Sequence, residues 1–566
     1  MGDDMTETEE MRRRVFAAEK AAWDALGAAH ADQIRQAERE LAGAVRTTPL
    51  TWVVLDDDPT GVQTVHDLPV FTDWSEETLR GALAEPGNMF YILTNSRALS
   101  DAETTVLHRD LMHHLCQALE SPGENVRQQR HLPADDGTLT GGQGENAGRQ
   151  KQPAADPDTS GRNLRGSAGL QVISRSDSTL RGHFPLEVDL VEEGLRTELG
   201  METDTVILAP FFEAGGRFTI HGIHYVRQNN ASGEQELVPA ALTEFAKDQT
   251  FGYRHSYLPA YVEEKTGGRI KADAVRIVPL ELLRSGDVDA VERILREKPA
   301  MVAVDALAPA DLRVFCAALY RRIRQGQRFV YRTAADFVRA AGGIEDRSLL
   351  TARDLFPARS GPSAASAGAK ERGQSVLPED AGNCAQCEAA GGVIVVGSHT
   401  EKTTRQLEAL RGLPGLDFIP FHSELVLSGG LAGEADRVRG LVERDIAQGK
   451  TAVFYTGRKV LEVPGDTGEK ALARSTAISD ALVSVIGGLR ETPRFILAKG
   501  GITSSDVGTK ALGVRRAWVP GQIMPGIPVW LCGQESRFPG VPYIIFPGNV
   551  GEDDTLRRIV EKLTAK

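Results

Sequence analysis

Short runs of apolar, often β-branched residues recur along the chain from residue 51, separated by longer stretches with apolar residues at helical spacing. The first set comprises TWVVL, MFYILT, LQVIS, TVILA, MVAVD and RFVY, and the second comprises GVIVVG, TAVFYTG, RFILAKGG, IPVWLCG and YIIFPG. Continuous apolar runs are typical of strands that are buried on both faces, and helices between them are typical of parallel sheets. The pattern therefore predicts an α/β fold of mostly parallel sheets covered by helices.

The chain has 566 residues, which is more than one ordinary domain contains. Residues 1–48 are rich in Ala, Glu, Arg and Gln with helical periodicity, so we expect a leading helical segment. Residues 49–357 and 392–566 each contain one set of strand-like runs and are predicted to form two α/β domains. Residues 121–168 are polar and Gly-rich and predict a disordered insertion in the first domain. Residues 358–391 have a similar composition and predict a linker.

The charge balance limits the classes of partner. The 65 Lys and Arg against 78 Asp and Glu give a formal net charge of −13, which disfavours nucleic acid and anionic membranes as partners. No apolar run approaches the roughly 18 residues of a membrane span, and the start lacks the features of a signal peptide. Five scattered cysteines favour a reducing compartment. We expect a cytoplasmic protein that binds small molecules, and base rates for metabolic enzymes favour a homodimer.

The stretch LDDDPTGVQT at 55–64 follows the first strand-like run and places Asp56, Asp57 and Asp58 side by side. In parallel α/β sheets, ligands bind beyond the carboxyl ends of the strands. Adjacent carboxylates repel one another unless a cation, an arginine or a substrate hydroxyl meets them. The stretch therefore indicates either a ligand site or an acidic turn that caps the next element.

A second polar loop, SRSDSTLRGHFPLE at 174–187, joins the strand-like run LQVIS to a helical stretch. Arginine can hold a carboxylate with two hydrogen bonds, while Asp and Ser bind hydroxyls, so this mixture suits a small polyhydroxy acid. A polar helix cap with a charged rim is the alternative interpretation. The stretch TNSR ends another strand in the same manner. The candidate side chains in these two loops are Arg97, Arg175, Asp177, Ser178, Thr179 and Arg181.

The strand ends of the second domain are Gly-rich instead. VVGSHTEKTTRQLEAL passes through Ser398, LAKGGITSSDVGTKAL passes through Gly500 and Gly501, and FPGNVGEDDTLRRIVEKL contains Gly548. Glycine lets backbone N–H groups approach a ligand, and a helix N-terminus favours phosphate. Three such turns in one domain predict a nucleotide pocket, although the GxxxxGK[ST] and GxGxxG patterns are both absent.

Read in order, DDDPTGVQTVHD, TNSRAL, SDSTLRGHFPLE, APFFEAGGRFTIHGIHYV, VVGSHTEKTTRQL, KGGITSSDV and MPGIPVW resemble the four-carbon acid sugar kinase family. The resemblance covers most of residues 50–563. It implies an N-terminal sugar-acid domain, a C-terminal nucleotide domain, and ATP-dependent phosphorylation of a sugar acid such as threonate, erythronate or 3-oxo-tetronate. Two alternatives stay open: a kinase of another polyol acid, and a non-catalytic sensor of nucleotide and sugar acid.

The resemblance also implies site residues. The acidic turn of the family falls on Asp57, Asp58, Thr60 and Gly61, its arginine on Arg97, and its substrate loop on residues 175–182. Arg175 stands where the family usually has lysine, which leaves the acid recognised open. The nucleotide contacts fall on Ser398, Gly500, Gly501, Ile502, Thr503 and Gly548.

Phosphoryl transfer needs a cation such as Mg²⁺ and a group that accepts the hydroxyl proton. Asp57 or Asp58 could be this base, with its neighbour orienting the substrate or helping to hold Mg²⁺. Asp177 is the rival candidate.

Overall fold

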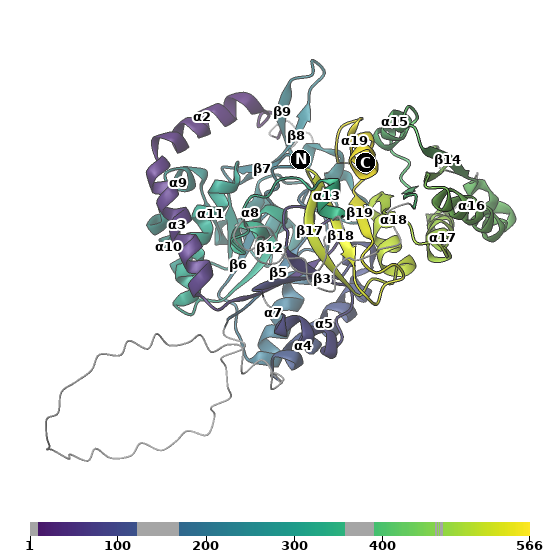
Figure 1. Cartoon of the computed structure of the whole chain (residues 1–566). Helices are drawn as coiled ribbons and strands as arrows, with labels where there is room; N and C mark the ends of the chain where they lie inside the picture. The colour runs from purple at the N-terminus through teal and green to yellow at the C-terminus, as the bar shows by residue number, and fades with distance from the viewer. Residues whose placement is uncertain are drawn as a thin grey trace, which may run out of the picture.

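The computed structural model describes residues 9–85, 87–120, 169–356, 390–458, 461, 463, 468–548 and 550–565 (Figure 1). The predicted insertion at 121–168 lies outside the described residues. So does the part of the predicted linker at 358–389. The apolar runs quoted above all form strands, which confirms the α/β prediction.

We call the described residues up to 341 the first half of the chain and those from 352 the second half. The first half contributes eight strands to one large sheet, and every neighbouring pair among them is parallel. In spatial order they are β10 (Val275–Val278), β11 (Met301–Val304), β6 (Thr205–Ala209), β12 (Phe329–Thr333), β5 (Leu170–Arg175), β2 (Thr51–Asp56), β4 (Met89–Leu93) and β3 (Leu68–Phe71).

The second half continues the same sheet, which has 15 strands in all. In spatial order these strands are β17 (Arg516–Met524), β18 (Ile527–Cys532), β19 (Pro542–Phe546), β16 (Ile496–Lys499), β13 (Val393–Val396), β15 (Thr451–Thr456) and β14 (Leu416–Phe421). From β19 to β14 the pairs are parallel, whereas β17, β18 and β19 pair antiparallel.

The two halves join where β3 pairs antiparallel with β17. One buried apolar cluster runs across this junction and includes Trp52 and Tyr91 from the first half and Val395 and Ile545 from the second. The two parallel sets predicted from the sequence therefore share a sheet and part of a core.

The junction also positions the strand ends. Three antiparallel pairs make the parallel set of the second half run opposite to that of the first. Strands twist by roughly 20–25° per step, and six steps in the order β2-β4-β3-β17-β18-β19-β16 separate β2 from β16. This twist turns the carboxyl ends of β2 and β16 towards the same side.

Helices cover both faces, as β2 shows by placing Trp52 and Val54 in one apolar cluster and Val53 and Leu55 in another. In the first half, one face is covered by α3 (Ala31–Thr47), α9 (Leu280–Arg284), α10 (Val288–Arg296), α11 (Pro309–Arg324) and α12 (Ala335–Ala341). The other face is covered by α4 (Glu76–Ala84), α5 (Asp101–Glu120), α7 (Leu186–Leu199) and α8 (Leu258–Lys265).

The second half is covered in the same way. Its helices are α16 (Leu431–Ala447) and α17 (Gly468–Gly487) on one face, and α13 (Ala352–Leu355), α15 (Glu401–Leu410) and α19 (Thr555–Thr564) on the other. A shorter helix, α18 (Gly501–Asp506), follows β16 directly.

The N-terminal segment forms α2 (Phe16–Ala29) and α3, which run along the outside of the first half in Figure 1. Ion pairs tie α3 to α11, with Glu38 Oε1 2.7 Å from Arg313 Nε and Glu40 Oε1 2.5 Å from Arg321 Nε.

A second, antiparallel sheet was not predicted from the sequence. It consists of β1 (Arg14–Val15), β9 (Gln235–Pro239), β8 (Ile223–Asn229) and β7 (Arg217–Ile220). The turn between β7 and β8 has positive φ at His221 (52°) and Gly222 (72°), as a tight hairpin of this kind requires. Figure 1 shows β8 and β9 projecting beyond the large sheet.

Candidate active site

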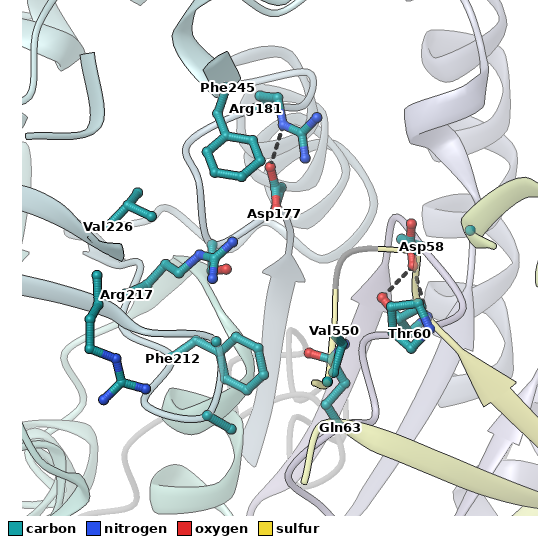
Figure 2. A pocket seen from close by; sticks show the side chains of 18 of the residues that line it. Asp58, Thr60, Gln63, Asp177, Arg181, Phe212, Arg217, Val226, Phe245 and Val550 are labelled. Carbon is teal, nitrogen blue, oxygen red and sulfur yellow. Dashed lines mark hydrogen bonds and ion pairs between the residues drawn. The ribbon is translucent and has the colours of Figure 1, made fainter. Parts of the chain in front are cut away.

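A cavity of about 740 Å³ lies between the two halves, with walls from the large sheet, the small sheet and the second-half turns (Figure 2). The first half contributes Asp58, Thr60, Gln63, Arg97, Arg175, Asp177, Ser178 and Arg181. The small sheet and its surrounding loops contribute Phe212, Arg217, Val226, Arg227, Glu244 and Phe245. The second half contributes Thr400, Lys402, Gly501, Gly548, Val550 and Glu552.

The three adjacent carboxylates after β2 have three different environments. Asp56 is buried, and Arg175 donates to it at 3.2 Å. Asp57 is also buried, and Arg97 contacts both of its oxygens, from Nε at 3.1 Å and from Nη2 at 2.5 Å. Asp58 faces the cavity and accepts hydrogen bonds from the backbone N–H and the hydroxyl of Thr60 at 2.8 and 2.5 Å. Arg175 and Arg97, the second of which also lies 3.3 Å from Asp58, thus offset the repulsion expected from the sequence.

Gly61 is required by this packing. A Cβ at this position would lie 1.9–2.2 Å from the carboxylate of Asp56, so any other residue would displace the acidic turn.

The pKa values of the acids differ accordingly. Burial raises the pKa of Asp56 to about 8, against the opposing charge of Arg175. Burial also acts to raise the pKa of Asp58, but the charge of Arg97 and the hydrogen bonds from Thr60 outweigh it and leave the pKa below its ordinary value. For Asp177 the same balance, with Arg97 and Arg181 as the cations, also leaves the pKa below its ordinary value. Asp58 and Asp177 are therefore ionised carboxylates that the strand-end loops of the first half present to the cavity.

The loop after β5 is held from both sides. Asp177 accepts from Arg181 Nε at 2.7 Å and from the hydroxyl of Thr179. Behind the loop, Tyr253 donates to the carbonyl of Thr179 at 2.7 Å, and Tyr261 donates to that of Leu180 at 2.9 Å. These bonds fix the backbone, so Asp177 and Ser178 are presented to the cavity without freedom to move.

Glu187, at the start of α7, connects two strand-end loops beneath the site. Its carboxylate accepts from Ser96 at 2.5 Å, from Ser176 at 3.2 Å and from Ser174 at 3.5 Å. The loop that carries Arg97 and the loop that carries Asp177 are therefore anchored on one buried acid.

The Gly-rich turns of the second half also converge. Gly500 has a φ of 127°, a conformation that favours glycine, and α18 begins at the next residue. A Cβ on Gly500 would lie 3.4 Å from Ser398 Cβ, and one on Gly548 would lie 3.7 Å from Ser398 Oγ. A Cβ on Gly501 would lie 3.8 Å from Asp58 Oδ2. The acidic turn of the first half therefore faces the start of α18.

Lys499, the last residue of β16, is fully buried beneath these turns. Its ammonium donates to the carbonyls of Pro547 (2.6 Å) and Gly548 (3.2 Å) and lies 3.8 Å from the ring centroid of Phe546. Burial lowers its pKa to about 7, with a smaller contribution from Lys402. Sequence reasoning missed this lysine, although it directly precedes the Gly-Gly pair.

The structure brings most of the residues predicted from the sequence together. Those that line the cavity are Asp58, Arg97, Arg175, Asp177, Ser178, Arg181, Gly501 and Gly548. Asp57 and Thr179 lie behind its wall and bond to Arg97 and Asp177. Ser398, Gly500 and Thr503 cluster beside Gly548, and the side chain of Ile502 is 69% exposed. The roles of all these residues stay predictions.

Other cavity residues were not singled out from the sequence, including Gln63, Arg217, Arg227, Phe245 and Lys402. Arg217 and Arg227 come from the small sheet. The alternation in RFTIHGIHYV and its His-Gly turn were the available signal for that hairpin.

A metal centre made of protein ligands alone is not found, since the described residues hold no group of three or more His, Cys, Asp or Glu suited to a metal ion. Mg²⁺ in kinases commonly takes only one or two carboxylates, together with substrate phosphates. The ionised Asp58 and Asp177 fit that smaller role. Among the helices of the described residues, none is both long and apolar enough to span a membrane.

Comparison with known proteins gives one family model for each half of the chain. The family model of a sugar-binding N-terminal domain matches residues 52–127 and 158–341, and that of a nucleotide-binding C-terminal domain matches residues 393–556. Fold and site thus define a protein that joins a sugar-binding domain to a nucleotide-binding domain. The chain belongs to the four-carbon acid sugar kinase family, as the order of its motifs predicted.

Two solved structures, the first two of the three below, share the fold at low sequence identity. A Haemophilus influenzae protein is 14% identical with a TM-score of 0.52, covering 90% of this chain and 100% of its own. A Salmonella typhimurium LT2 protein is 14% identical with a TM-score of 0.53, covering 90% and 98%. A Bordetella bronchiseptica protein, solved as a domain-swapped dimer with bound citrate, is 18% identical over 90% and 98%, with a TM-score of 0.31. No curated protein matches the sequence.

Proposed function

We propose that this protein is an ATP-dependent kinase that phosphorylates a terminal hydroxyl of a four-carbon sugar acid of the threonate, erythronate or 3-oxo-tetronate type. One observation carries the proposal: Asp58 Oδ2 lies 3.8 Å from the Cβ position of Gly501, so an ionised acid of the sugar-binding half faces the first turn of α18. A hydroxyl bound at Asp58 and a phosphate bound at α18 would meet at this corner of the cavity. The family membership of both halves supports the same reading.

Asp58 is the best candidate for the general base. Asp57 is only 2% exposed at its side chain and does not line the cavity, whereas Asp58 does, so Asp58 is the one of the two that a substrate hydroxyl can reach. Asp177 also faces the cavity, but it is Asp58 whose Oδ2 lies 3.8 Å from the Cβ position of Gly501 and so faces the start of α18, whereas Asp177 is bound by Arg181 at 2.7 Å. We assign Asp57 to holding Arg97 in place and Asp177 to binding substrate hydroxyls.

The second half would hold the nucleotide. Gly501 and Gly548 border the cavity, where their backbone N–H groups would bind phosphate, and Lys402 lines the same cavity with a positive charge. Asp177 would help to hold Mg²⁺ together with the ATP phosphates, which leaves Asp58 free to accept the proton, and the cation would neutralise charge on the phosphates during transfer.

A substrate panel tests the proposal. The purified protein is incubated with ATP, Mg²⁺ and, in turn, D- and L-threonate, D- and L-erythronate and 3-oxo-tetronate, and ADP release and the phosphorylated acid are both measured. We expect turnover with at least one acid and none with the Asp58→Asn variant, which controls for contaminating kinases.

Other outcomes would redirect or reject the proposal. Turnover only with a longer polyol acid would shift the substrate class. Calorimetric binding of ATP and acid without any phosphorylated product would contradict the kinase assignment and support a sensor.

A further inference from the structure

Five arginines line the cavity, and three of them are already paired with carboxylates of the protein. Arg97 pairs with Asp57 at 2.5 Å and reaches Asp58 at 3.3 Å. Arg175 pairs with Asp56 at 3.2 Å and is only 4% exposed. These two arginines hold the acidic turn, and neither leaves its charge unmatched for a ligand.

The third, Arg181, is likewise paired. It bonds to Asp177 at 2.7 Å and lies 3.6 Å from Asp248. Its guanidinium also lies 5.1 Å from the ring centroid of Phe245.

Arg217, the first residue of β7, is different. Within the described part of the chain no carboxylate lies within 4.0 Å of its guanidinium, and its Nε is buried without a hydrogen-bond partner. Its guanidinium stacks on the same Phe245 ring as Arg181, at 5.4 Å. Arg217 is partly buried, and its nearest counter-charges, Asp177 and Glu244, act on it only from beyond ion-pair distance. A partly desolvated guanidinium without a direct partner in a cavity wall points to an anionic ligand.

The fifth arginine, Arg227, has another use. Its guanidinium stacks on Phe16 at 4.9 Å and on Phe218 at 5.7 Å, so it packs the N-terminal segment against the small sheet. Arg217 is therefore the cavity arginine that has neither an acidic partner nor a second aromatic ring.

Arg217 is held firmly in this position. Its backbone exchanges two hydrogen bonds with Phe212, at 2.9 and 3.1 Å, which closes the loop before β7. Asp336 anchors the same loop by accepting from the N–H of Glu213 at 2.7 Å. A Cβ on Gly215 would lie 3.2 Å from Arg217 Nη1, so the guanidinium lies close over the loop backbone. A fixed, planar cation of this kind binds a carboxylate at low entropic cost.

The position of Arg217 also indicates which anion it binds. Figure 2 shows Arg217, Phe245 and Asp177 on one side of the cavity and Asp58 and Thr60 on the other. The phosphate turns of the second half adjoin Asp58, so the ATP phosphates belong to that side. The end of a sugar acid opposite to its reacting hydroxyl is its carboxylate, which would then lie at Arg217.

We propose that Arg217 binds the carboxylate of the sugar acid and thereby sets the preference of this protein for acids over neutral polyols, an inference that rests on the proposed function. Asp177, between Arg217 and the acidic turn, binds hydroxyls along the chain of the substrate. The replacement of the usual lysine by Arg175 then leaves recognition of the carboxylate unaffected, because Arg175 is bound to Asp56.

The test compares acids with neutral polyols of the same length. The kcat/KM values for D- and L-threonate and D- and L-erythronate are measured against those for threitol and erythritol, in the wild type and in Arg217→Met and Arg217→Lys. For Arg217→Met we expect the KM for the acid to rise about 10- to 100-fold, the range of a lost charge-assisted hydrogen bond. The KM for ATP should stay within about twofold of the wild-type value. The kcat/KM for the acid divided by the kcat/KM for the tetritol should fall by the same factor by which the KM for the acid rises. Arg217→Lys keeps the charge without the planar fork and should fall between the two.

Arg254→Met is the matched control, because Arg254 is a 73% exposed arginine that pairs with Glu264 outside the cavity, and it should behave as the wild type. An unchanged acid-to-tetritol ratio in Arg217→Met would overturn the proposal, as would a rise in the KM for ATP instead of the acid. If the acid-to-tetritol ratio of kcat/KM fell in Arg227→Met but not in Arg217→Met, the carboxylate would be bound by Arg227, and the proposal would be wrong. If Arg217→Met fails to fold, an unchanged KM for the acid in a folded Arg217→Lys would overturn it equally.

Binding separates this inference from the proposed function. Stabilisation by threonate or erythronate is measured as a shift in Tm without ATP. A shift in the wild type that is lost in Arg217→Met, without turnover by either, would refute the kinase while supporting the carboxylate site. Turnover with an unchanged acid-to-tetritol ratio in Arg217→Met would refute the carboxylate site while supporting the kinase.

Discussion

Asp58→Asn is the substitution that tests the proposed mechanism most directly. Asn keeps the Oδ1 acceptor that binds the N–H and hydroxyl of Thr60, at 2.8 and 2.5 Å, and loses only the long contact of Oδ2 with Arg97 Nη1 at 3.3 Å, so the acidic turn should stay folded. The negative charge that would accept the proton is lost. Loss of a general base costs roughly 10²- to 10⁴-fold in rate, which corresponds to about 3–5 kcal/mol in the barrier. We therefore expect kcat to fall by at least 10²-fold, with a smaller fall in Tm than in Asp57→Asn, because Arg97 bonds to Asp58 once at 3.3 Å and to Asp57 twice, at 2.5 and 3.1 Å.

Asp57→Asn is the matched comparison, because it changes the neighbouring carboxylate in the same way. Both Asp57 oxygens accept from Arg97, and an Asn amide would turn an N–H₂ group against one guanidinium N–H. A charge-assisted hydrogen bond contributes about 1.5–3 kcal/mol, so a loss of about 2 kcal/mol in the free energy of unfolding is expected. That loss lowers the Tm by roughly 4–8 °C in a domain of ordinary size.

The assay measures kcat at saturating acid and ATP, together with Tm, for both variants between pH 5 and 8. The pKa of Asp58 lies below its ordinary value, so Asp58 stays ionised throughout this range and should cause no fall in kcat on the acid side above about pH 5. A kcat within tenfold of the wild type for Asp58→Asn would refute the assignment of the base and leave Asp177 as the next candidate. Unfolding of Asp58→Asn would show that the acidic turn is a structural cap.

Two further predictions concern the second half. Burial lowers the pKa of Lys499 to about 7 from its ordinary 10.5, so between these pH values the unfolded chain binds a proton that the folded chain has released. From pH 7 to 9 the free energy of unfolding of the wild type should therefore rise relative to that of Lys499→Met, by up to about 1.4 kcal/mol per pH unit. Urea denaturation at each pH measures this difference. If the free energy of unfolding changed equally with pH in both proteins, the burial of the ammonium would be contradicted. Gly500→Ala, at a φ of 127°, should destabilise the turn and raise the KM for ATP at least tenfold, whereas Gly415→Ala, at a φ of 78° and far from the cavity, should lower Tm without changing the KM for ATP.

The strands of the large sheet were predictable because both of their faces are buried, so consecutive residues in each strand are apolar. In β2, Val53 and Val54 are both completely buried although they point to opposite faces, and β13 is buried at every position. Such strands need no alternation, so an apolar run bounded by polar turns identifies them. The convergence of their carboxyl ends on one site follows from the parallel arrangement.

The small sheet was missed because its strands carry a weaker signal. In β7, Phe218 and Ile220 are buried, but Arg217 begins the strand and His221 occupies the turn at a φ of 52°. Polar residues at both ends of a four-residue strand disguise its alternation. The consequence is functional, since this sheet supplies the one wall of the cavity for which sequence reasoning named no residue.

The division of labour among the three adjacent aspartates could not be predicted either. It depends on Arg97 and Arg175, which lie 40 and 119 residues further along the chain from their partners Asp57 and Asp56. Composition indicates only that such a cluster needs cations. Which acid is left facing the cavity is decided by the tertiary positions of those two arginines.

The way in which the two halves join was the feature of the fold that the sequence predicted least. It depends on β17, whose Pro520 and Gly521 disguise it as a loop and whose pairing with β18 is interrupted by two register shifts. This strand joins β3 on one side and β18 on the other, so twist accumulated through it brings the end of β16 to the end of β2. Because a shared sheet with a shared apolar cluster sets the distance between Asp58 and Gly501, the geometry that we propose for phosphoryl transfer depends on the packed core and not on a loop.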